Sequence, residues 1–300
     1  MKDYSFTQQY ALIGLNGLDS LHASTAKMAV MRGILAAKFF ESHFIMIEEE
    51  NIEEIKDEWK VILEQIKKMN KKEAKLLEQE VIAELKDDGV LEEVQDILAC
   101  DINYDSADVN IKVYRSDAEL YQKIIESIRA EILEEGPITI ECFAFLWIMR
   151  ESCCIHDLFS TEEQKCLEQR MLALKSNNKV YSFFWEEEFH KSLENITVKF
   201  LKVKSSLFKN PYLQGVNLLF PFVERRQAIF IDFVVLGTTV SERRLAVMEY
   251  LCQHGHYVEE VKNGTETLLK IDNNYYRIFP ATRRSYKIPI QGVDIVPVYK

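Results

Sequence analysis

Apolar and polar positions alternate at helical spacing along most of the first two thirds of the chain. Residues 6–15 predict a short apolar helix, and residues 24–41 predict a second helix with many small residues. Residues 118–133 predict a helix with its apolar side chains on one side. Residues 52–99 keep this period among many charged positions, and Asp87-Asp88-Gly89 interrupts it, so we expect two or more helices there. Residues 140–150 are apolar on nearly every side, which predicts a central, buried helix.

Local signals refine this helical region. Asn16-Gly17 predicts a turn, and Gly33 inside a helix predicts close contact with a neighbouring element. Ser160-Thr161-Glu162-Glu163 is a capping box, so a helix is expected from there to about residue 174. A further helix is expected near residues 185–193, whereas residues 101–117 show no sustained period and predict a loop.

The last hundred residues have a different pattern. Residues 216–240 are strongly apolar and rich in β-branched residues, which leaves strand and buried helix equally open. Ser241 predicts the cap of a helix over residues 242–253. Three short strands then follow at residues 257–261, 267–271 and 275–279, and Asn263-Gly264 is a strong hairpin signal. The pattern therefore predicts a mainly α protein with a C-terminal α+β, winged-helix-like module.

Charge divides the chain at the same place. The whole sequence carries 37 Lys and Arg against 48 Asp and Glu, a net charge of −11. Residues 199–300 carry 15 against 9, a net of +6, so residues 1–198 have a net of −17. We therefore expect an acidic helical domain over residues 1–198 and a basic α+β domain over residues 199–300. This division indicates either an anionic partner at the basic end or two domains docked through opposite charge.

The sequence offers little evidence for catalysis. Its few glycines form no phosphate-binding loop, and no nucleophile-elbow or zinc-protease motif occurs. Cysteine and histidine residues do gather between residues 142 and 166, at Cys142, Cys153, Cys154, His156 and Cys166. Adjacent cysteines diverge on a helix, and positions two apart do not face each other, so neither a metal site nor a Cys–His pair is expected. His254-Gly255-His256 is better explained by a helix C-terminus. We predict no catalytic residue, no metal and no cofactor.

From the sequence we also expect no signal peptide and no membrane-spanning helix. Met1 is followed directly by polar residues, and no uncharged apolar stretch approaches the length of a spanning helix. The expected location is cytoplasmic, with reduced thiols.

The C-terminal cations are the main candidates for binding. Arg277, Arg283, Arg284 and Lys287 alternate with tyrosine residues. Arginine binds phosphate bidentately, and aromatic rings stack on bases or lie at a membrane interface. The set would suit a lipid headgroup or nucleic acid. A purely structural alternative is that the rings pack inward and the arginines pair with the acidic domain.

The N-terminal part resembles the Golgi phosphoprotein 3 family of lipid-binding membrane-traffic adaptors and their bacterial relatives. The resemblance lies in Phe6-Thr7-Gln8-Gln9-Tyr10-Ala11-Leu12-Ile13-Gly14-Leu15-Asn16-Gly17, in Met31-Arg32-Gly33-Ile34-Leu35-Ala36-Ala37, and in the order of elements over residues 120–174, together about half of the chain. It implies that Arg32 contacts a phosphoinositide headgroup. The partner tryptophan of the family is replaced near Ala23. Lys165 and Arg170 are the nearest matches to a second pair of headgroup cations, and the β-rich C-terminal end departs from the family.

The resulting functional prediction is a non-enzymatic intracellular binding protein, peripheral on a membrane, that binds an anionic phospholipid headgroup. One alternative is a nucleic-acid-binding regulator that uses the winged-helix-like module. The other is a scaffold that binds a protein partner.

Overall fold

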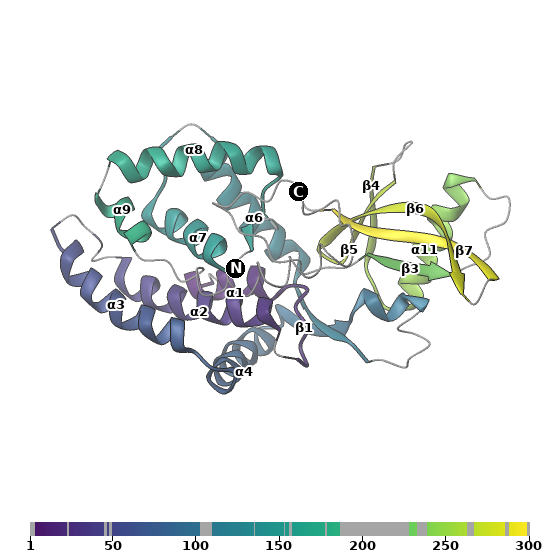
Figure 1. Ribbon diagram of the computed structural model, residues 1–300, viewed down its shortest axis with the longest axis horizontal. Coiled ribbons are helices and arrows are strands. Elements are labelled where there is room, and N and C mark those ends of the chain that lie inside the picture. The colour runs from purple at the N-terminus through teal and green to yellow at the C-terminus, as the bar shows by residue number, and fades with distance from the viewer. Residues whose placement is uncertain are drawn as a thin grey trace.

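A helical lobe and a sheet lobe lie side by side in the computed structural model (Figure 1). The structure describes residues 4–22, 24–44, 47, 50–102, 110–134, 136–152, 154–155, 158–177, 179–186, 228–232, 239–262, 267–285 and 288–298. The helical lobe contains α1 (Phe6–Leu15), α2 (Thr25–His43), α3 (Ile52–Lys68), α4 (Lys71–Asp87), α6 (Ala118–Leu133), α7 (Ile140–Glu151), α8 (Thr161–Asn177) and α9 (Lys179–Glu186).

Helix α7 lies at the centre of the helical lobe, as its apolar sequence predicts. From Cys142 to Glu151 every residue of α7 is buried, and Trp147 is fully enclosed. The rings of Phe40 and Phe184 pack against Trp147, with ring centroids 5.9 Å and 5.8 Å away. Burial of these large rings is a major source of stability for the lobe.

Gly33 permits a close contact between α1 and α2. A Cβ atom at this position would lie 1.9 Å from the hydroxyl oxygen of Tyr10, whose side chain is fully buried. Only glycine leaves room for the ring. The tight contact predicted from the sequence is therefore confirmed.

A two-stranded sheet lies between the two lobes where the sequence predicted helix and loop. Strands β1 (Leu91–Gln95) and β2 (Lys112–Ser116) pair antiparallel, so the predictions of a helix through residue 99 and of a loop over residues 101–117 are wrong for these residues. The 3-10 helix η2 (Ile97–Cys100) follows β1. Ile97 and Cys100 pack in the core of the sheet lobe, although most of their sequence neighbours belong to the helical lobe.

The sheet lobe is a five-stranded antiparallel sheet with one described helix. Its strands are β3 (Ile229–Asp232), β4 (Val258–Lys262), β5 (Leu268–Ile271), β6 (Asn274–Ser285) and β7 (Ile288–Val298), in the order β3-β7-β6-β5-β4. Helix α11 (Val240–Gln253) packs on one face through Val247 and Leu251, and η2 packs on the same face. This core is separate from that of the helical lobe.

The structure confirms a mixed helix-and-strand protein, with some elements placed differently from the prediction. The Ser160–Glu163 capping box forms, since each residue's amide donates to the other's side chain at 2.8 Å and 3.3 Å. Thr239, rather than Ser241, caps α11. Helix α9 begins at Lys179, before its predicted start. The three predicted strands are present, but β3 and β7 extend the sheet to five. Asn263-Gly264 lies outside the described residues.

Within the described part of the chain, the helices are all too short or too polar to cross a membrane.

Replacing Gly33 by alanine tests the α1–α2 contact. The added methyl overlaps the Tyr10 side chain, and overpacking of a core costs about 1–3 kcal/mol. We expect Gly33→Ala to lower the free energy of unfolding in urea by about this amount. In a Tyr10→Phe background the loss should be smaller because the nearest atom is gone; an equal loss would show that the hydroxyl contact is not the cause.

Candidate functional site

Arg32 lies in α2 and points toward the end of α3. Its Nη2 donates to the carbonyl oxygen of Lys67 at 3.3 Å, in the last turn of α3. The guanidinium is half-buried, and this burial lowers the pKa of Arg32. A cation at a helix C-terminus stabilises the exposed carbonyl groups. Arg32 thus binds α2 to the α3–α4 turn.

The two α8 candidates have different surroundings. Lys165 is exposed, whereas Arg170 is partly buried and contacts the C-terminal end of α6. The Arg170 guanidinium donates to the carbonyl oxygens of Ile132 and Gly136, and to that of Glu134 at 2.8 Å. These carbonyls would otherwise lack partners at the helix end. Arg170 therefore has a capping role.

The C-terminal candidates lie in the sheet lobe and do not meet Arg32. Arg277 and Arg283 are exposed on β6. Arg283 pairs with Asp294 of β7 at 2.8 Å, and its guanidinium lies 4.7 Å from the centre of the Phe230 ring. Arg284 is the next residue of β6, and Lys287 lies outside the described residues. Those predicted lipid-binding residues whose side chains the structure describes are thus spread over both lobes and form no single site.

The basic excess of the C-terminal third comes mainly from one part of it. Residues 228–300, which contain the sheet lobe, carry nine Lys and Arg against eight Asp and Glu. Residues 199–227 carry six against one and lie outside the described part of the chain. The region that contains the sheet lobe therefore has a net charge close to zero. Binding of an anion there depends on where the individual cations lie and not on the net charge.

A lysine cluster that the sequence analysis overlooked lies at the α3–α4 turn. Its members are Lys67, Lys68, Lys71, Lys72 and Lys75, and residues 64–75 contain only two acidic residues, Glu64 and Glu73. All of these lysines are exposed except Lys67, which is half-buried. Lys68 and Lys67 pair with Glu64 at 3.1 Å and 3.6 Å. No described residue forms an ion pair with Lys71, Lys72 or Lys75. In the sequence, this cluster could have been found as two adjacent lysine pairs, Lys67-Lys68 and Lys71-Lys72, that are separated by two uncharged residues.

One member of the lysine cluster, Lys68, lines a cleft between α2, α3 and α4. The cleft has a volume of about 480 Å³, and Leu35, Met69 and Leu77 provide its apolar lining. Glu64, Gln65 and Glu73 also line it. Leu35 lies one helical turn after Arg32, on the same side of α2. Cations and apolar side chains thus occur together at this end of the helical lobe.

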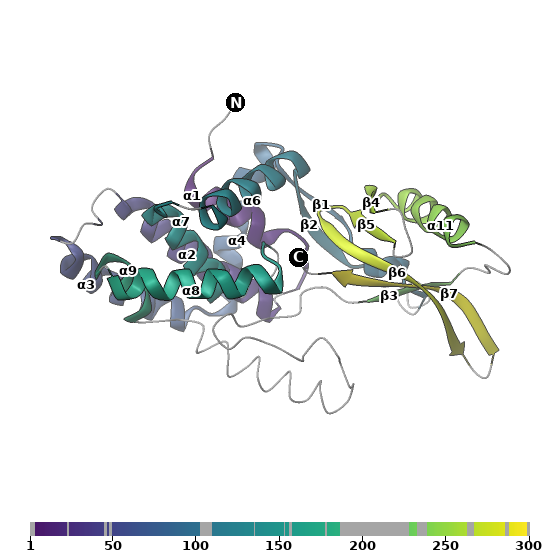
Figure 2. The same cartoon turned by 90° about the horizontal axis from the view of Figure 1, so that it is seen from above.

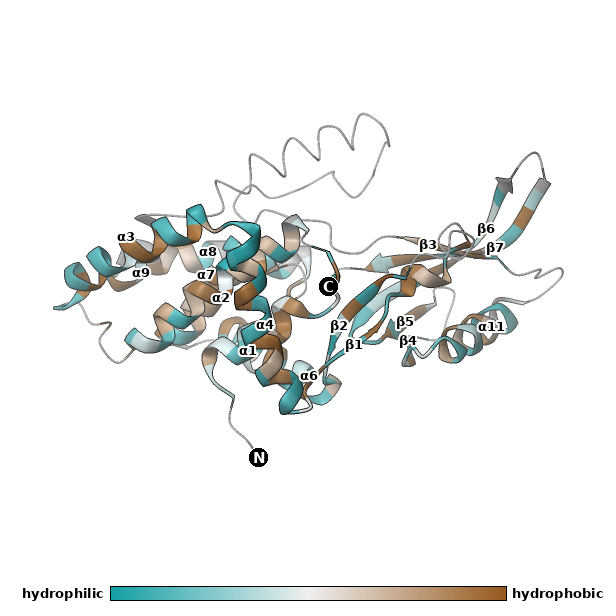
Figure 3. Ribbon diagram, turned by 90° about the horizontal axis from the view of Figure 1, so that it is seen from below, coloured by the Kyte–Doolittle hydropathy of each residue, from teal (hydrophilic) through white to brown (hydrophobic). Residues whose placement is uncertain are grey.

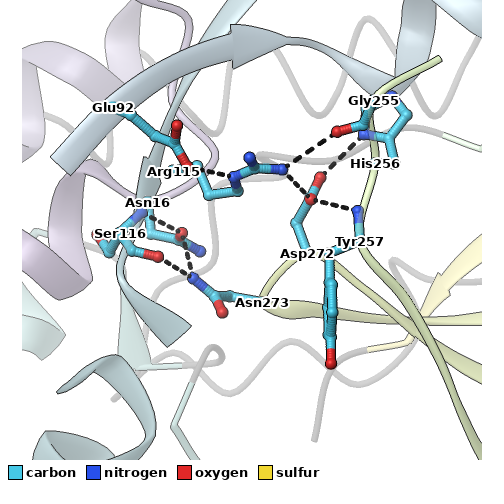
Figure 4. Close-up of polar contacts among 9 residues, drawn as sticks. All are labelled: Asn16, Glu92, Arg115, Ser116, Gly255, His256, Tyr257, Asp272 and Asn273. Carbon is cyan, nitrogen blue, oxygen red and sulfur yellow. Dashed lines mark hydrogen bonds and ion pairs between the residues drawn. The ribbon is translucent and has the colours of Figure 1, made fainter. Parts of the chain in front are cut away.

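A second polar cluster joins the two lobes (Figure 4). Asp272, in the turn between β5 and β6, accepts from Arg115 of β2 at 2.7 Å and from the amide of Tyr257 at 3.2 Å. Its other oxygen lies 3.0 Å from Nδ1 of His256. Arg115 also pairs with Glu92 at 2.9 Å. Burial alone would raise the pKa of Asp272, but the contacts with His256, Arg115 and Tyr257 lower it below its usual value.

Asn273 extends this junction into the helical lobe. Its side-chain amide donates to Oδ1 of Asn16 at 3.1 Å and to the carbonyl oxygen of Ser116 at 2.8 Å. The amide of Ser116 donates to the same Asn16 oxygen at 3.3 Å. All three residues are buried. Breaking these bonds would leave buried polar groups without partners, which is costly.

His256 and Asp96 complete the junction. The His256 ring is buried, and its Nε2 has no hydrogen-bond partner among the described residues. Burial raises the pKa of Asp96, while the nearby His256 lowers it and the Asp19 and Asp272 carboxylates raise it further. The junction thus holds one carboxyl with a raised pKa and one with a lowered pKa. Its hydrogen bonds link Asn16, Arg115 and Ser116 to the turn between β5 and β6.

Among the described residues, no three His, Cys, Asp or Glu side chains are placed to share a metal ion. Cys153 and His156 lie outside the described residues. Burial and the neighbouring Glu131 carboxylate raise the pKa of the Cys142 thiol, which disfavours the reactive thiolate.

A double-mutant cycle between Arg115→Ala and Asp272→Asn tests the junction. The two side chains are mostly buried and in direct contact, so we expect a coupling energy of roughly 1–3 kcal/mol in urea unfolding. The matched cycle between Arg115→Ala and Glu92→Gln, in which the carboxylate is more exposed than that of Asp272, should give at most about 1 kcal/mol. Equal coupling in both cycles would contradict an energetic link through Asp272.

The lowered pKa of Asp272 makes its contribution sensitive to acid. The carboxylate is more acidic in the folded than in the unfolded protein, where an aspartate has a pKa of about 3.9. The stabilisation is present above that value and is lost as the pH falls through the folded-state pKa. We expect the difference in urea midpoint between wild type and Asp272→Asn to shrink below about pH 4. A constant difference down to lower pH would argue against this.

Comparison with known proteins identifies no relative: no family model, no curated protein and no solved structure matches the chain. The resemblance to the Golgi phosphoprotein 3 family therefore stays a prediction that rests on the residues quoted for it.

Proposed function

We propose that the chain is a non-enzymatic protein that binds anionic membrane surfaces through the lysine cluster at the α3–α4 turn. The observation that carries this proposal is the exposure of Lys68, Lys71 and Lys72 at the α3–α4 turn, with Lys68 lining the cleft, on a lobe that is otherwise strongly acidic. Clusters of basic residues attract anionic lipids, and each lysine near such a surface contributes about 1 kcal/mol.

Exposed apolar side chains beside the lysines support membrane contact. Leu76, which is 59% exposed, lies one helical turn after Lys72. Val61, which is 60% exposed, lies two turns before Lys68 on the same side of α3. A helical surface with both lysines and leucines is typical of proteins that lie in the membrane interface. Figure 3 shows hydrophilic and hydrophobic residues alternating along the helices of this lobe.

The helix geometry also favours an anion at the turn. Lys71 and Lys72 occupy the first turn of α4, where the helix dipole is positive. Cations there are unfavourable for the helix itself, whereas an anionic headgroup would relieve the repulsion. Arg32 contributes from α2, because its contact with Lys67 holds the end of α3 beside the cleft. This placement suits the headgroup role that the family resemblance implies for Arg32.

The alternative of a winged-helix module that binds nucleic acid has less support. Helix α11 would be the recognition helix, but it covers the buried face of the sheet. Strict alternation along β6 places Arg277 and Arg283 on the opposite face from the buried Tyr276. The helix and the arginines therefore share no surface. A scaffold role that binds a protein partner stays a prediction that no described contact favours.

Vesicle sedimentation tests the proposal. The wild-type protein should bind phosphatidylcholine vesicles that contain phosphatidylserine at low salt, and should not bind phosphatidylcholine alone. Lys71→Ala with Lys72→Ala should cost about 2 kcal/mol, or roughly a 30-fold loss of partitioning. Binding of the wild type should also weaken as salt screens the surface charge.

The control is Lys123→Ala with Lys179→Ala, which removes the same charge from exposed positions of α6 and α9. This variant should bind anionic vesicles nearly as well as wild type. Equal losses in both double variants, or equal binding to neutral vesicles, would refute the lysine cluster as the contact surface.

A further inference from the structure

Strand β4 forms an open edge of the five-stranded sheet. It is the last strand in the order β3-β7-β6-β5-β4, and Figure 2 shows it on the side of the sheet away from β3. The opposite edge, at β3, is covered, because the amide of Phe230 donates to the Asp101 carboxylate at 2.7 Å. In the described part of the chain, neither a strand nor a side chain bonds to the outer edge of β4 in this way. An uncovered edge is a template for pairing with another segment.

The backbone of β4 presents two residues to this edge. The amide of Asp272 donates to the carbonyl oxygen of Tyr257 at 2.7 Å, so the backbone groups of Tyr257 face β5. Successive residues of an antiparallel strand direct their backbone groups to alternate sides. Glu259 therefore also faces β5, whereas the N–H and C=O groups of Val258 and Glu260 point away from β5, toward the open edge. Val258 and Glu260 thus offer donors and acceptors at the spacing that an added strand requires.

The exposed side chains of this segment have a simple pattern. Tyr257 and Val261 are 65% and 46% exposed, and Glu259 lies between them, also exposed. Tyr257 and Glu259 lie on the same face of the sheet, since side chains alternate along a strand. Glu260, on the other face, pairs with Arg244 of α11 at 3.1 Å, whereas no described residue forms an ion pair with Glu259. The edge thus presents one available carboxylate between two apolar side chains.

A β-bulge at the end of β4 limits the edge but does not close it. The register with β5 shifts between Glu260 and Lys262. Bulges and lysines on an edge strand discourage unspecific pairing. Here they leave the first residues of β4, Val258 to Glu260, in regular register with β5. The edge therefore admits a short partner strand.

The charge on this edge disfavours a second copy of the chain as the partner. Symmetrical antiparallel pairing through Val258 and Glu260 places Glu259 of one copy directly opposite Glu259 of the other. Like charges in such positions destabilise a sheet. A membrane surface offers no peptide groups for the open backbone. A strand from a different protein can supply both the peptide groups and a cation opposite Glu259.

From the open backbone groups, the covered edge at β3 and the exposed carboxylate between apolar side chains, we infer that β4 binds an extended peptide segment of another protein. The peptide adds a strand beside β4, and its affinity comes from main-chain hydrogen bonds to Val258 and Glu260. Its specificity comes from a Lys or Arg opposite Glu259, with apolar residues two positions before and two positions after it, against Tyr257 and Val261. This surface lies on the sheet lobe and is independent of the lysine cluster.

An NMR titration of the ¹⁵N-labelled full chain with the blocked peptide Val-Thr-Lys-Thr-Val tests the inference. We expect saturable shifts of the amide signals of Val258 and Glu260, because these N–H groups gain acceptors. The peptide Val-Thr-Glu-Thr-Val should bind roughly 2- to 30-fold more weakly, because an opposite-charge pair becomes a like-charge pair. A lysine peptide with both threonine nitrogens methylated should show no saturable binding, since it cannot donate to the carbonyl oxygens of Val258 and Glu260.

A charge reversal on the protein separates the outcomes. Glu259→Lys should favour the peptide with Glu, whereas Glu249→Lys, the same change at an exposed position of α11, should keep the wild-type preference. An unchanged preference in a folded Glu259→Lys variant would overturn the inference. The peptide comparison on the wild type needs no variant: equal affinity for both charged peptides, no saturable shift at Val258 and Glu260, or undiminished binding of the methylated peptide would each overturn it. Self-association of the chain through β4 without peptide would overturn it in favour of a second copy.

Discussion

The carboxylate of Asp272 is the point on which the arrangement of the lobes depends. The helical and sheet lobes have separate apolar cores, so no shared core fixes one lobe against the other. Asp272 accepts from Arg115, His256 and the Tyr257 amide, and its backbone has a φ of 52°, which is uncommon outside glycine. Several contacts from both lobes together hold this conformation, which an isolated turn would not favour.

Strand β2 carries these contacts because adjacent residues of a strand point to opposite sides. Tyr114 points into the helical lobe, where its hydroxyl donates to Glu78 at 2.9 Å, and Lys27 pairs with the same carboxylate at 2.8 Å. Arg115 points to the sheet lobe and Asp272. The Ser116 side chain points into the helical lobe again, where its hydroxyl donates to the carbonyl oxygen of Leu12 at 2.6 Å. Five residues of strand therefore connect two cores that the chain builds from distant segments.

The elements that sequence predicted best are those whose stabilising contacts are local. Helices α1, α6 and α7 have N-terminal caps within their own sequence, and they are either apolar along most of their length, as in α1 and α7, or apolar on one side, as in α6. Strands β1 and β2 have neither: they are short, and exposed Glu92 and Glu93 conceal any alternation. The long β6–β7 hairpin was underestimated because prolines and arginines interrupt its apolar pattern. These strands form because they pair with segments that are distant in the sequence. Amino-acid composition does not reveal such pairing.

The same distinction explains why the binding residues were harder to predict than the helices. Arg32 and Arg170 were selected by resemblance. Both donate to carbonyl oxygens at the C-terminal ends of other helices. Those carbonyl groups lack partners within their own helix, and the sequence alone does not show which side chain reaches them. The lysine cluster was overlooked because charge was summed over a whole acidic half, where its local excess disappears.

A phosphate that binds a cationic side chain competes with the acceptor groups that this side chain already contacts. For phosphate binding, the position of a cation in the fold therefore matters more than the number of cations. Cations that satisfy helix ends are partly committed to the chain itself. Lys71 and Lys72 lie instead at a helix start, where the backbone offers them no acceptor. Arg283 is partly exposed but already has a carboxylate partner, Asp294, on the neighbouring strand. By this criterion the α3–α4 turn is one part of the described chain whose cations stay available to an anion.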